Sequence, residues 1–352
     1  MAVSTPSNRS SRIAGRVNLE LLVTKLVVVV GVGSVGSQVA EELANYVGRL
    51  RLFDGKPLQE HHLPRHALRK AYVDQNKAVS MKHYLSEEIP TLQVEARPWQ
   101  INSAMPDDVF DVLLHDADLI VAATDNREVQ RAIGRRALAL DIPAVFPGLY
   151  ERNGGEVFVQ LSPERPCFLC RDHFRPAQQV LRGVAATNPD IVTIIALANR
   201  LSLAVLDPGA DYRRLLAPER GERWPPQLFV HNDLVLAKHI VPWHQGCPSC
   251  AIGPSPLRPD AVQAWQAAQR VRAAEIPEPR PVPHTATPST TPSHPATQRS
   301  SSADPGELIT SGLCVFAWWF FLTDGFNGFA VIWNPLAWIP VIGWFFYAFT
   351  SH

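Results

Sequence analysis

The stretch that most limits this chain's fold is VVVVGVGSVGSQVAEEL, residues 27–43. Its four consecutive valines show no polar alternation, which is typical of a parallel strand buried on both faces. Gly31, Gly33 and Gly36 follow in G-x-G-x-x-G spacing, which lets a tight turn bring backbone N–H groups close to a phosphate. A helix expected over residues 34–46 would direct its positive N-terminal end at that anion. The stretch therefore predicts a nucleotide-binding strand–turn–helix unit.

A second strand-like run, LRLFD, ends at Asp54, eighteen residues after Gly36. This spacing suits a carboxylate that hydrogen-bonds to a ribose hydroxyl. These features alone serve NAD, FAD and ATP equally well, and a turn that binds nothing could also contain them. Strand-like and helical stretches alternate over residues 1–274, so we expect an α/β domain with a Rossmann-like, mainly parallel sheet flanked by helices.

Composition separates two further regions from this domain. Residues 275–306 contain eight prolines among many Ser and Thr and almost no large apolar residue, which predicts a disordered linker. Residues 307–352 contain five of the nine tryptophans and neither Lys nor Arg. The whole chain has 33 basic and 33 acidic residues, and this balance gives no indication of a nucleic-acid partner.

The apolar tail predicts a hydrophobic helical hairpin that associates with a membrane. A spanning helix needs about 20 apolar residues, which the run 329–349 reaches and the run 308–323 does not. A buried soluble hairpin or an oligomer contact is the alternative, although a flexible linker offers no core to cover so much aromatic surface. The first 20 residues are polar and lack the apolar stretch of a secretory signal, so we expect the large domain in the cytoplasm.

Charged motifs follow Asp54 in the order GKPLQEHHLPRHAL, DQNKAVSMK and DLIVAATDNREVQR. In combination they resemble the ThiF/MoeB-type family of ubiquitin-activating-enzyme-like adenylyltransferases, over residues 9 to about 251. The resemblance implies that the nucleotide is ATP. It also implies that Gly31, Gly33 and Gly36 bind this nucleotide and that Asp54 binds its ribose.

The same resemblance assigns roles to charged side chains. Arg65 and Lys77 would contact the ATP phosphates, and Asp125 would hold Mg²⁺, with Asn126 beside it. Arg12, in RSSRI, would reach the ATP of a neighbouring subunit, which implies a homodimer. Taken singly, Arg65 and Lys77 also fit surface charges and Asp125 also fits a helix N-cap. Their joint order favours the site.

These roles are chemically sensible for adenylation, which joins a carboxylate to the α-phosphate of ATP and expels pyrophosphate. Cations and a metal-binding carboxylate around the triphosphate would stabilise the charge that develops on the leaving group. No general base is needed, because the attacking carboxylate is already ionised at pH 7.

Three positions depart from the family pattern. His62 and His66 stand where Asn and Gln are usual, and Lys56 replaces the second aspartate of a D-x-D pair. An imidazole can donate a hydrogen bond to a phosphate, and its titration near neutrality would make ATP affinity depend on pH. We expect His61, His62 and His66 to face solvent or phosphate rather than to bind a metal. A degenerate, inactive domain is the alternative.

Two C-x-x-C pairs, Cys167 with Cys170 and Cys247 with Cys250, lie 77 positions apart. Four thiolates in two such knuckles are typical of a closed, structural Zn²⁺ site, with free or disulfide-bonded cysteines as the alternative. The resembled family has the same two pairs. The segment 179–195 between them has no cysteine, so we expect the reaction to stop at the acyl-adenylate. The acceptor would be a thiol or persulfide on another protein.

The resemblance implies that the carboxylate belongs to the C-terminal glycine of a ubiquitin-like or sulfur-carrier protein. The glycine-rich segment 148–160 is expected to help shape the site. Other functions remain open from the residues alone. They are a nicotinamide or flavin oxidoreductase, an inactive membrane scaffold that binds a ubiquitin-like partner, and an enzyme that adenylates a peptide or small carboxylate.

Overall fold

The computed structural model describes residues 13, 15–150, 154–161, 166–173, 187–222, 225–232, 235–242, 244 and 246–251. All of them lie in the first of the two units into which the chain divides, residues 1–283 and 284–352. Arg12, the predicted linker and the predicted hairpin lie outside the described residues, so these predictions stay predictions.

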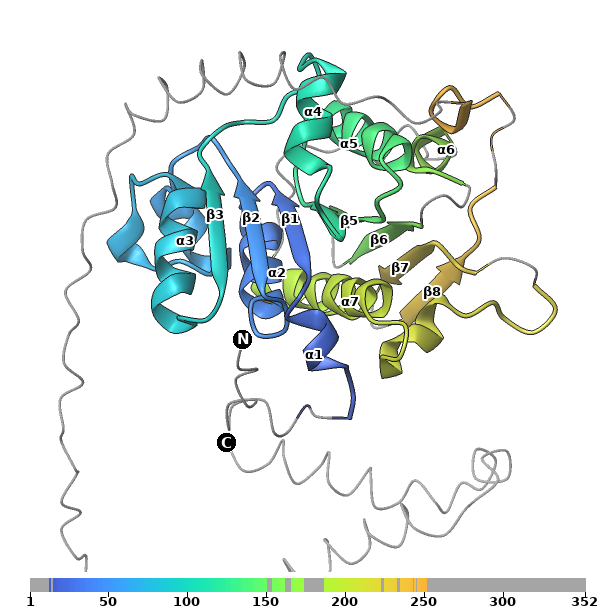
Figure 1. Cartoon of the computed structure of the whole chain (residues 1–352), viewed down its shortest axis with the longest axis horizontal. Helices are drawn as coiled ribbons and strands as arrows, with labels where there is room; N and C mark the ends of the chain where they lie inside the picture. Colours follow the sequence, from blue (N-terminus) through green and yellow to red (C-terminus); the bar gives the residue numbers. More distant parts are fainter. Residues whose placement is uncertain are drawn as a thin grey trace, which may run out of the picture. The chain divides into compact units, whose positions relative to one another are not determined.

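The described residues form one eight-stranded sheet in the order β3-β2-β1-β4-β5-β6-β7-β8 (Figure 1). Its parallel half consists of β1 (Leu26–Val30), β2 (Arg49–Phe53), β3 (Gln93–Arg97), β4 (Leu119–Ala122) and β5 (Ala144–Tyr150). Its antiparallel half continues with β6 (Gly154–Gln160), β7 (Leu228–Asn232) and β8 (Val235–His239). The expected α/β, mainly parallel sheet is thus confirmed around the glycine turn. It gives way to antiparallel pairing beyond β5.

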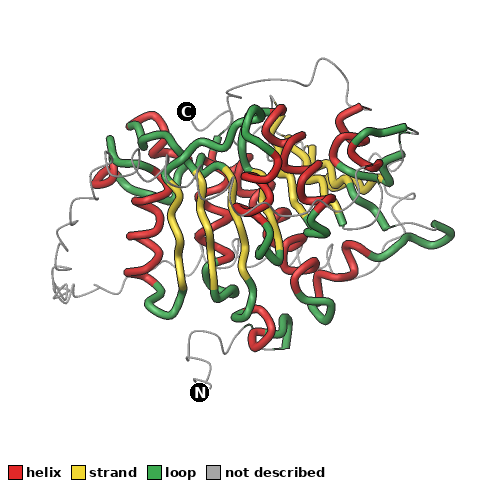
Figure 2. Tube along the Cα trace, turned by 45° about the horizontal axis from the view of Figure 1, so that its top comes forward, coloured by secondary structure: helices red, strands yellow, loops and turns green. Residues whose placement is uncertain are grey.

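Helices cover both faces of the sheet (Figures 1 and 2). One face packs against α2 (Ser34–Leu43), α3 (Lys77–Glu88) and α7 (Asn188–Leu206). The other packs against α4 (Asp107–Leu114), α5 (Arg127–Ala139) and α6 (Phe168–His173). Strand β1 shows why a valine run fits here. Val27 and Val29 point into one core and Val28 and Val30 into the other, because successive strand side chains alternate between faces.

Short helical segments complete the described chain: α1 (Leu19–Leu22) and the 3₁₀ turns η2 (Glu60–Arg65), η3 (Lys70–Tyr72), η5 (Asp211–Leu216) and η6 (Ser249–Ala251). Of these, η2 carries a predicted site residue, and η6 carries one cysteine of the second pair.

Helix α7 is, among the described residues, the one helix long and apolar enough to cross a membrane. It is a core helix, however. Ile191, Ile194, Ala198 and Leu201 are buried, and the helix packs against β5 and β6. Its apolar composition therefore reflects its place against the sheet and beside α2.

Candidate functional site

The fold brings most of the described residues that were predicted to bind nucleotide to the carboxyl ends of the parallel strands. A cavity of about 740 Å³ opens there, beside the point between β1 and β4 where the strand order reverses. Its lining includes Gly31, Gly33, Asp54, Arg65, Lys77, Asp125 and Asn126. Open α/β sheets bind their ligands at such a reversal. Residues that are far apart in the sequence therefore line one cavity.

Each of the three glycines in the turn is required or accommodated for a different structural reason. Gly31 has a φ of +91°, and a Cβ atom there would lie 2.8 Å from the carbonyl oxygen of Ala123. At Gly36 a Cβ atom would lie 1.9 Å from the Gly31 oxygen, so this glycine allows the helix to pack against the turn and does not line the cavity. Gly33 precedes α2 and borders open space, where a ligand can approach the backbone.

Asp54 follows β2 and ties the glycine turn to the end of that strand. Its two carboxylate oxygens accept hydrogen bonds from the backbone N–H groups of Val32 (2.9 Å) and Lys56 (2.8 Å). A carboxylate has about four acceptor positions, so these bonds leave capacity for a ribose hydroxyl.

Cationic side chains gather on the β2 side of the cavity. Lys77 is the first residue of α3, which Asn76 caps, and only 5% of Lys77 is exposed. Among the described residues, Lys77 makes no ion pair, although a buried ammonium is costly without an anion. Arg65 ends η2, and Lys56, at the position of the family's second aspartate, also lines the cavity. This arrangement suits a polyanionic ligand.

Asp125 and Asn126 lie in the loop between β4 and α5. The helix N-cap is Asn126, whose Oδ1 accepts from the N–H groups of Glu128 (3.0 Å) and Val129 (3.3 Å). The alternative that Asp125 caps this helix is therefore wrong. Among the described residues the Asp125 carboxylate makes no hydrogen bond, and it lines the cavity. Mg²⁺ in nucleotide sites is bound through one or two carboxylates together with phosphate oxygens, and Asp125 fits that pattern.

His62 lies on the cavity wall, as expected for a phosphate-facing histidine. Its Nδ1 accepts from the N–H of Gln59 at 3.0 Å, which places the proton on Nε2. Burial, followed by the positive charge of Lys77, lowers the pKa of His62 to about 4. A neutral imidazole is thus the donor at pH 7, and the expected titration near neutrality is wrong for this site before an anion binds.

His66 differs from its prediction, because it faces neither solvent nor the cavity. It is 3% exposed, and its Nε2 donates to the Val32 carbonyl at 2.9 Å while its Nδ1 accepts from the Leu68 N–H at 3.0 Å. Burial outweighs the hydrogen bond to Val32 and lowers the pKa of His66 to about 4. This histidine is a neutral clamp between η2 and the glycine turn.

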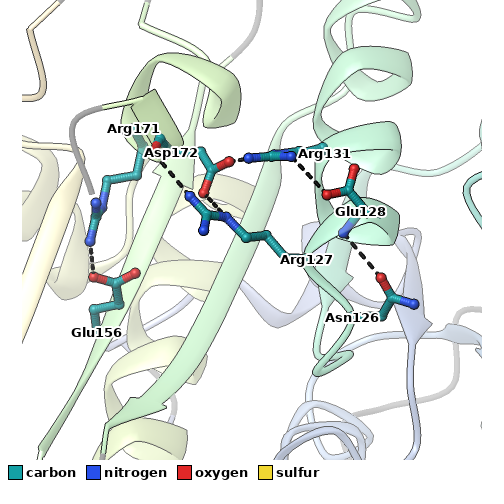
Figure 3. Close-up of polar contacts among 7 residues, drawn as sticks. All are labelled: Asn126, Arg127, Glu128, Arg131, Glu156, Arg171 and Asp172. Atoms are coloured by element: carbon teal, nitrogen blue, oxygen red, sulfur yellow. Dashed lines mark hydrogen bonds and ion pairs between the residues drawn. The ribbon is translucent and has the colours of Figure 1, made fainter. Parts of the chain in front are cut away.

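The cavity also has an arginine cluster that sequence reasoning missed (Figure 3). Arg127 and Arg131 of α5 both donate through Nε to the carboxylate of Asp172 on α6. Both arginines line the cavity, whereas the Asp172 side chain is 1% exposed and does not. Arg171 pairs with Glu156 of β6, another lining residue. The sequence signal was the R-x-x-x-R spacing directly after TDN, but only the fold reveals its partner.

The four predicted cysteine ligands form one buried cluster. The Cys167 Sγ atom lies 3.8 Å from that of Cys170 and 3.6 Å from that of Cys247. The Cys170 and Cys250 Sγ atoms are 3.7 Å apart. A tetrahedron with Zn–S bonds of about 2.3 Å separates its sulfurs by about 3.8 Å, so the donor set fits Zn²⁺ and excludes disulfides. Burial raises the pKa of the Cys250 thiol to about 11, and a bound cation would stabilise its thiolate form.

Fold and site together define an α/β nucleotide-binding domain with a basic cavity and a four-cysteine cluster. The model of the ThiF family matches residues 7–217, which is more than half of the chain, and the protein belongs to this family. The family resemblance of its motifs is thereby confirmed.

Two curated relatives match part of the chain. Molybdopterin-synthase adenylyltransferase of Escherichia coli is 26% identical over 153 residues, which are 43% of this chain and 60% of that protein. Sulfur carrier protein adenylyltransferase of Thermus thermophilus is 30% identical over 151 residues, which are 41% of this chain and 54% of that protein. The chain therefore spans only 54–60% of the length of these relatives.

Solved structures share the fold at low sequence identity. E. coli MccB, solved with ATP, has a TM-score of 0.54 and 15% identity, covering 66% of this chain and 68% of that chain. PaaA has a TM-score of 0.51 and 18% identity, covering 63% and 66%. At these identities the likeness shows the fold alone.

Proposed function

We propose that this protein adenylates a carboxylate. A carboxylate oxygen of the substrate bonds to the α-phosphorus of ATP, and the bond from that phosphorus to the bridging oxygen breaks to release pyrophosphate. One observation carries the proposal: the glycine turn, Asp54, Lys77 and Asp125 come from separate segments and line a single cavity. The names of both curated relatives, which are adenylyltransferases, support the same reaction.

The residues divide the work by charge. The turn and the N-terminus of α2 offer backbone N–H groups to phosphate. Arg65 and Lys77 offset the charge that grows on the leaving pyrophosphate. Asp125 would hold Mg²⁺, which supplies further charge neutralisation when bound. With Lys56, three cations on one wall favour a triphosphate over the diphosphate of a nicotinamide or flavin cofactor.

The substrate proposed is the C-terminal glycine carboxylate of a ubiquitin-like or sulfur-carrier protein, in line with the names of the relatives. Among the described residues, no cysteine lines the cavity. The proposed reaction stops at the acyl-adenylate, in line with the absence of cysteine from the sequence of segment 179–195, and a thiol or persulfide of another protein is the proposed acceptor.

A peptide or small carboxylate is the second candidate substrate. The fold is shared with MccB, a microcin C7 biosynthetic enzyme solved in complex with N-formylated MccA. Such a substrate would use the same cavity and the same chemistry.

We further infer an organisation in which Arg12 reaches the ATP of a second subunit and residues 307–352 hold the protein at a membrane, with the large domain in the cytoplasm. The sequence features given above support this arrangement. A coil of about 30 residues between domain and tail has a root-mean-square span of roughly 30 Å, so a tethered domain could reach partners near the membrane.

The test is ATP–pyrophosphate exchange by the full chain, loaded with zinc and supplied with Mg²⁺. Glycine-terminated carrier proteins and short peptides are added one at a time, and Asp125→Ala is the control. Carrier-dependent exchange that Asp125→Ala abolishes would establish the reaction and its substrate class. A folded, zinc-loaded protein that gives no exchange with any candidate would instead favour an inactive scaffold.

A further inference from the structure

A second cationic pair faces the cavity from the side opposite Lys77. We propose that Arg127 and Arg131 receive the substrate carboxylate, and that Asp172 is the positioning residue that holds both guanidinium groups on the cavity wall. This inference rests on the proposed adenylation and assigns its substrate end.

Strand order separates the two ends of the cavity. β2, which leads to Asp54 and the phosphate-facing cations, lies on one side of the β1–β4 pair, and β5 lies on the other. The arginines extend from α5, which follows β4, and share their end of the cavity with residues 146–149 and Glu156. The glycine turn and the cations beyond β2 would bind the phosphates at the first end of the cavity. The substrate carboxylate, which attacks the α-phosphate, would then bind at the β5 end.

The charges at the β5 end suit an anion. Two guanidinium groups share the single buried carboxylate of Asp172, which leaves one positive charge in excess. Glu128 also contacts Arg131 at 2.7 Å, but its side chain is 58% exposed and water screens it. A carboxylate approaching the α-phosphate is repelled by it, and an adjacent cation lowers that barrier.

The hydrogen bonds leave one terminal nitrogen of each arginine available. Arg127 uses Nε and Nη2 on Asp172, and Arg131 uses Nε on Asp172 and Nη1 on Glu128. Among the described residues, Nη1 of Arg127 and Nη2 of Arg131 make no hydrogen bond or ion pair. Together they can donate one hydrogen bond each to the two oxygens of a carboxylate.

Asp172 acts only through the arginines, because it does not line the cavity itself. A free arginine side chain has about 2 kcal/mol of rotamer entropy to lose when it orders. A contact through Nε restricts the guanidinium before the substrate arrives. Asp172 is in turn fixed by α6, whose preceding residues and first turn carry Cys167 and Cys170.

The test compares Michaelis constants in ATP–pyrophosphate exchange, using the glycine-terminated carrier that drives exchange in the wild-type protein. Asp172→Asn should raise KM for the carrier roughly tenfold, because the two guanidinium groups lose the buried carboxylate that orders them, with KM for ATP within about twofold. Arg131→Gln should do the same while keeping the Asp172–Arg127 pair. The Arg131→Gln variant therefore still tests the proposal if Asp172→Asn does not fold.

The matched control is Asp111→Asn. Asp111 of α4 is a buried carboxylate that pairs with Arg136 of α5, the helix that also carries Arg127 and Arg131, and neither Asp111 nor Arg136 lines the cavity. Its loss should lower the melting temperature but leave both Michaelis constants unchanged.

Two results would overturn the assignment. One is a folded Asp172→Asn or Arg131→Gln variant whose carrier KM stays within twofold of wild type. The other is an equal rise in both Michaelis constants, as a general distortion would produce. Absence of exchange in the wild-type protein would reject the adenylation itself, and this inference with it.

Discussion

Lys77 combines burial with the absence of an acidic partner among the described residues. Such a charge destabilises the free protein and is compensated only when an anion binds. Lys77→Met should therefore raise the free energy of unfolding by about 1 kcal/mol or more, while lowering exchange activity by about two orders of magnitude. Thermal unfolding and exchange rates measure the two effects.

Lys82→Met is the control for this prediction, because Lys82 lies on the same helix and is exposed. The free energy of unfolding and the exchange activity of Lys82→Met should both stay near the wild-type values. A Lys77→Met protein that is less stable than wild type would mean that the ammonium has a stabilising partner in the free protein.

His66 predicts a specific acid sensitivity. Its pKa is about 4 when folded, against 6.5 in the unfolded chain. Between these values the unfolded chain binds a proton that the folded protein rejects, so the stability present above pH 6.5 declines as pH falls towards 4. The full effect is about 3 kcal/mol. Urea unfolding of wild type and His66→Gln across this range should show a shallower pH dependence in the variant, and equal slopes would contradict it.

At the residue scale, the sequence predicted side chains whose roles follow from chain order. Gly31, Asp54 and Asp125 end or follow strands, so a parallel sheet must bring them together. It could not predict that His66 turns inward, because the local path of η2 decides that direction. Nor could it pair Asp172 with Arg131, since 41 residues separate them and only the packing of α6 on α5 joins them.

At the scale of elements, two glycines of the strand–turn–helix unit have different roles: Gly36 allows close packing, and Gly33 leaves space for a ligand. Gly36→Ala should destabilise the fold by several kcal/mol, because its Cβ would overlap the Gly31 oxygen at 1.9 Å. Gly33→Ala should fold normally, because its Cβ meets nothing within 4 Å, yet it would place a methyl group where phosphate approaches.

Melting temperatures and calorimetric binding of a non-hydrolysable ATP analogue test this pair. The expected pattern is a low melting temperature for Gly36→Ala and weak binding at a wild-type melting temperature for Gly33→Ala. The reverse pattern would mean that Gly33 has a structural role in the turn.

The antiparallel half of the sheet was not predicted. It follows from the length of the connection between β5 and β6. Only residues 151–153 separate β5 from β6, and so short a link can form a hairpin but not a crossover. The glycine-rich letters GLYERNGG indicated a site rather than a reversal. The valine run of β1, by contrast, predicted its strand directly, because both of its faces are buried.

For the whole molecule, the cysteine cluster should govern stability. A metal that joins the two pairs closes a loop of about 80 residues. The lost entropy of the unfolded chain corresponds to a stabilisation of the folded protein by about 4 kcal/mol. Chelation of the metal, or Cys247→Ser, should lower the melting temperature and weaken binding of the ATP analogue. Cys314→Ser, outside the two pairs, is the control. A melting temperature insensitive to chelation would contradict a structural metal.

The distance between the two cysteine pairs also has a consequence for the order of synthesis. Strands β1–β5, the glycine turn, Arg127 and Arg131 all precede Cys167 in the chain. A ribosome therefore completes the phosphate-facing half first, and N-terminal parts generally fold first during synthesis. When helix α6 leaves the ribosome, only two of the four metal-binding cysteines have been made. The cysteine cluster that fixes this helix is complete only after Cys250 has been added. A nascent chain that ends between the pairs would carry a complete glycine turn beside arginines not yet held in place.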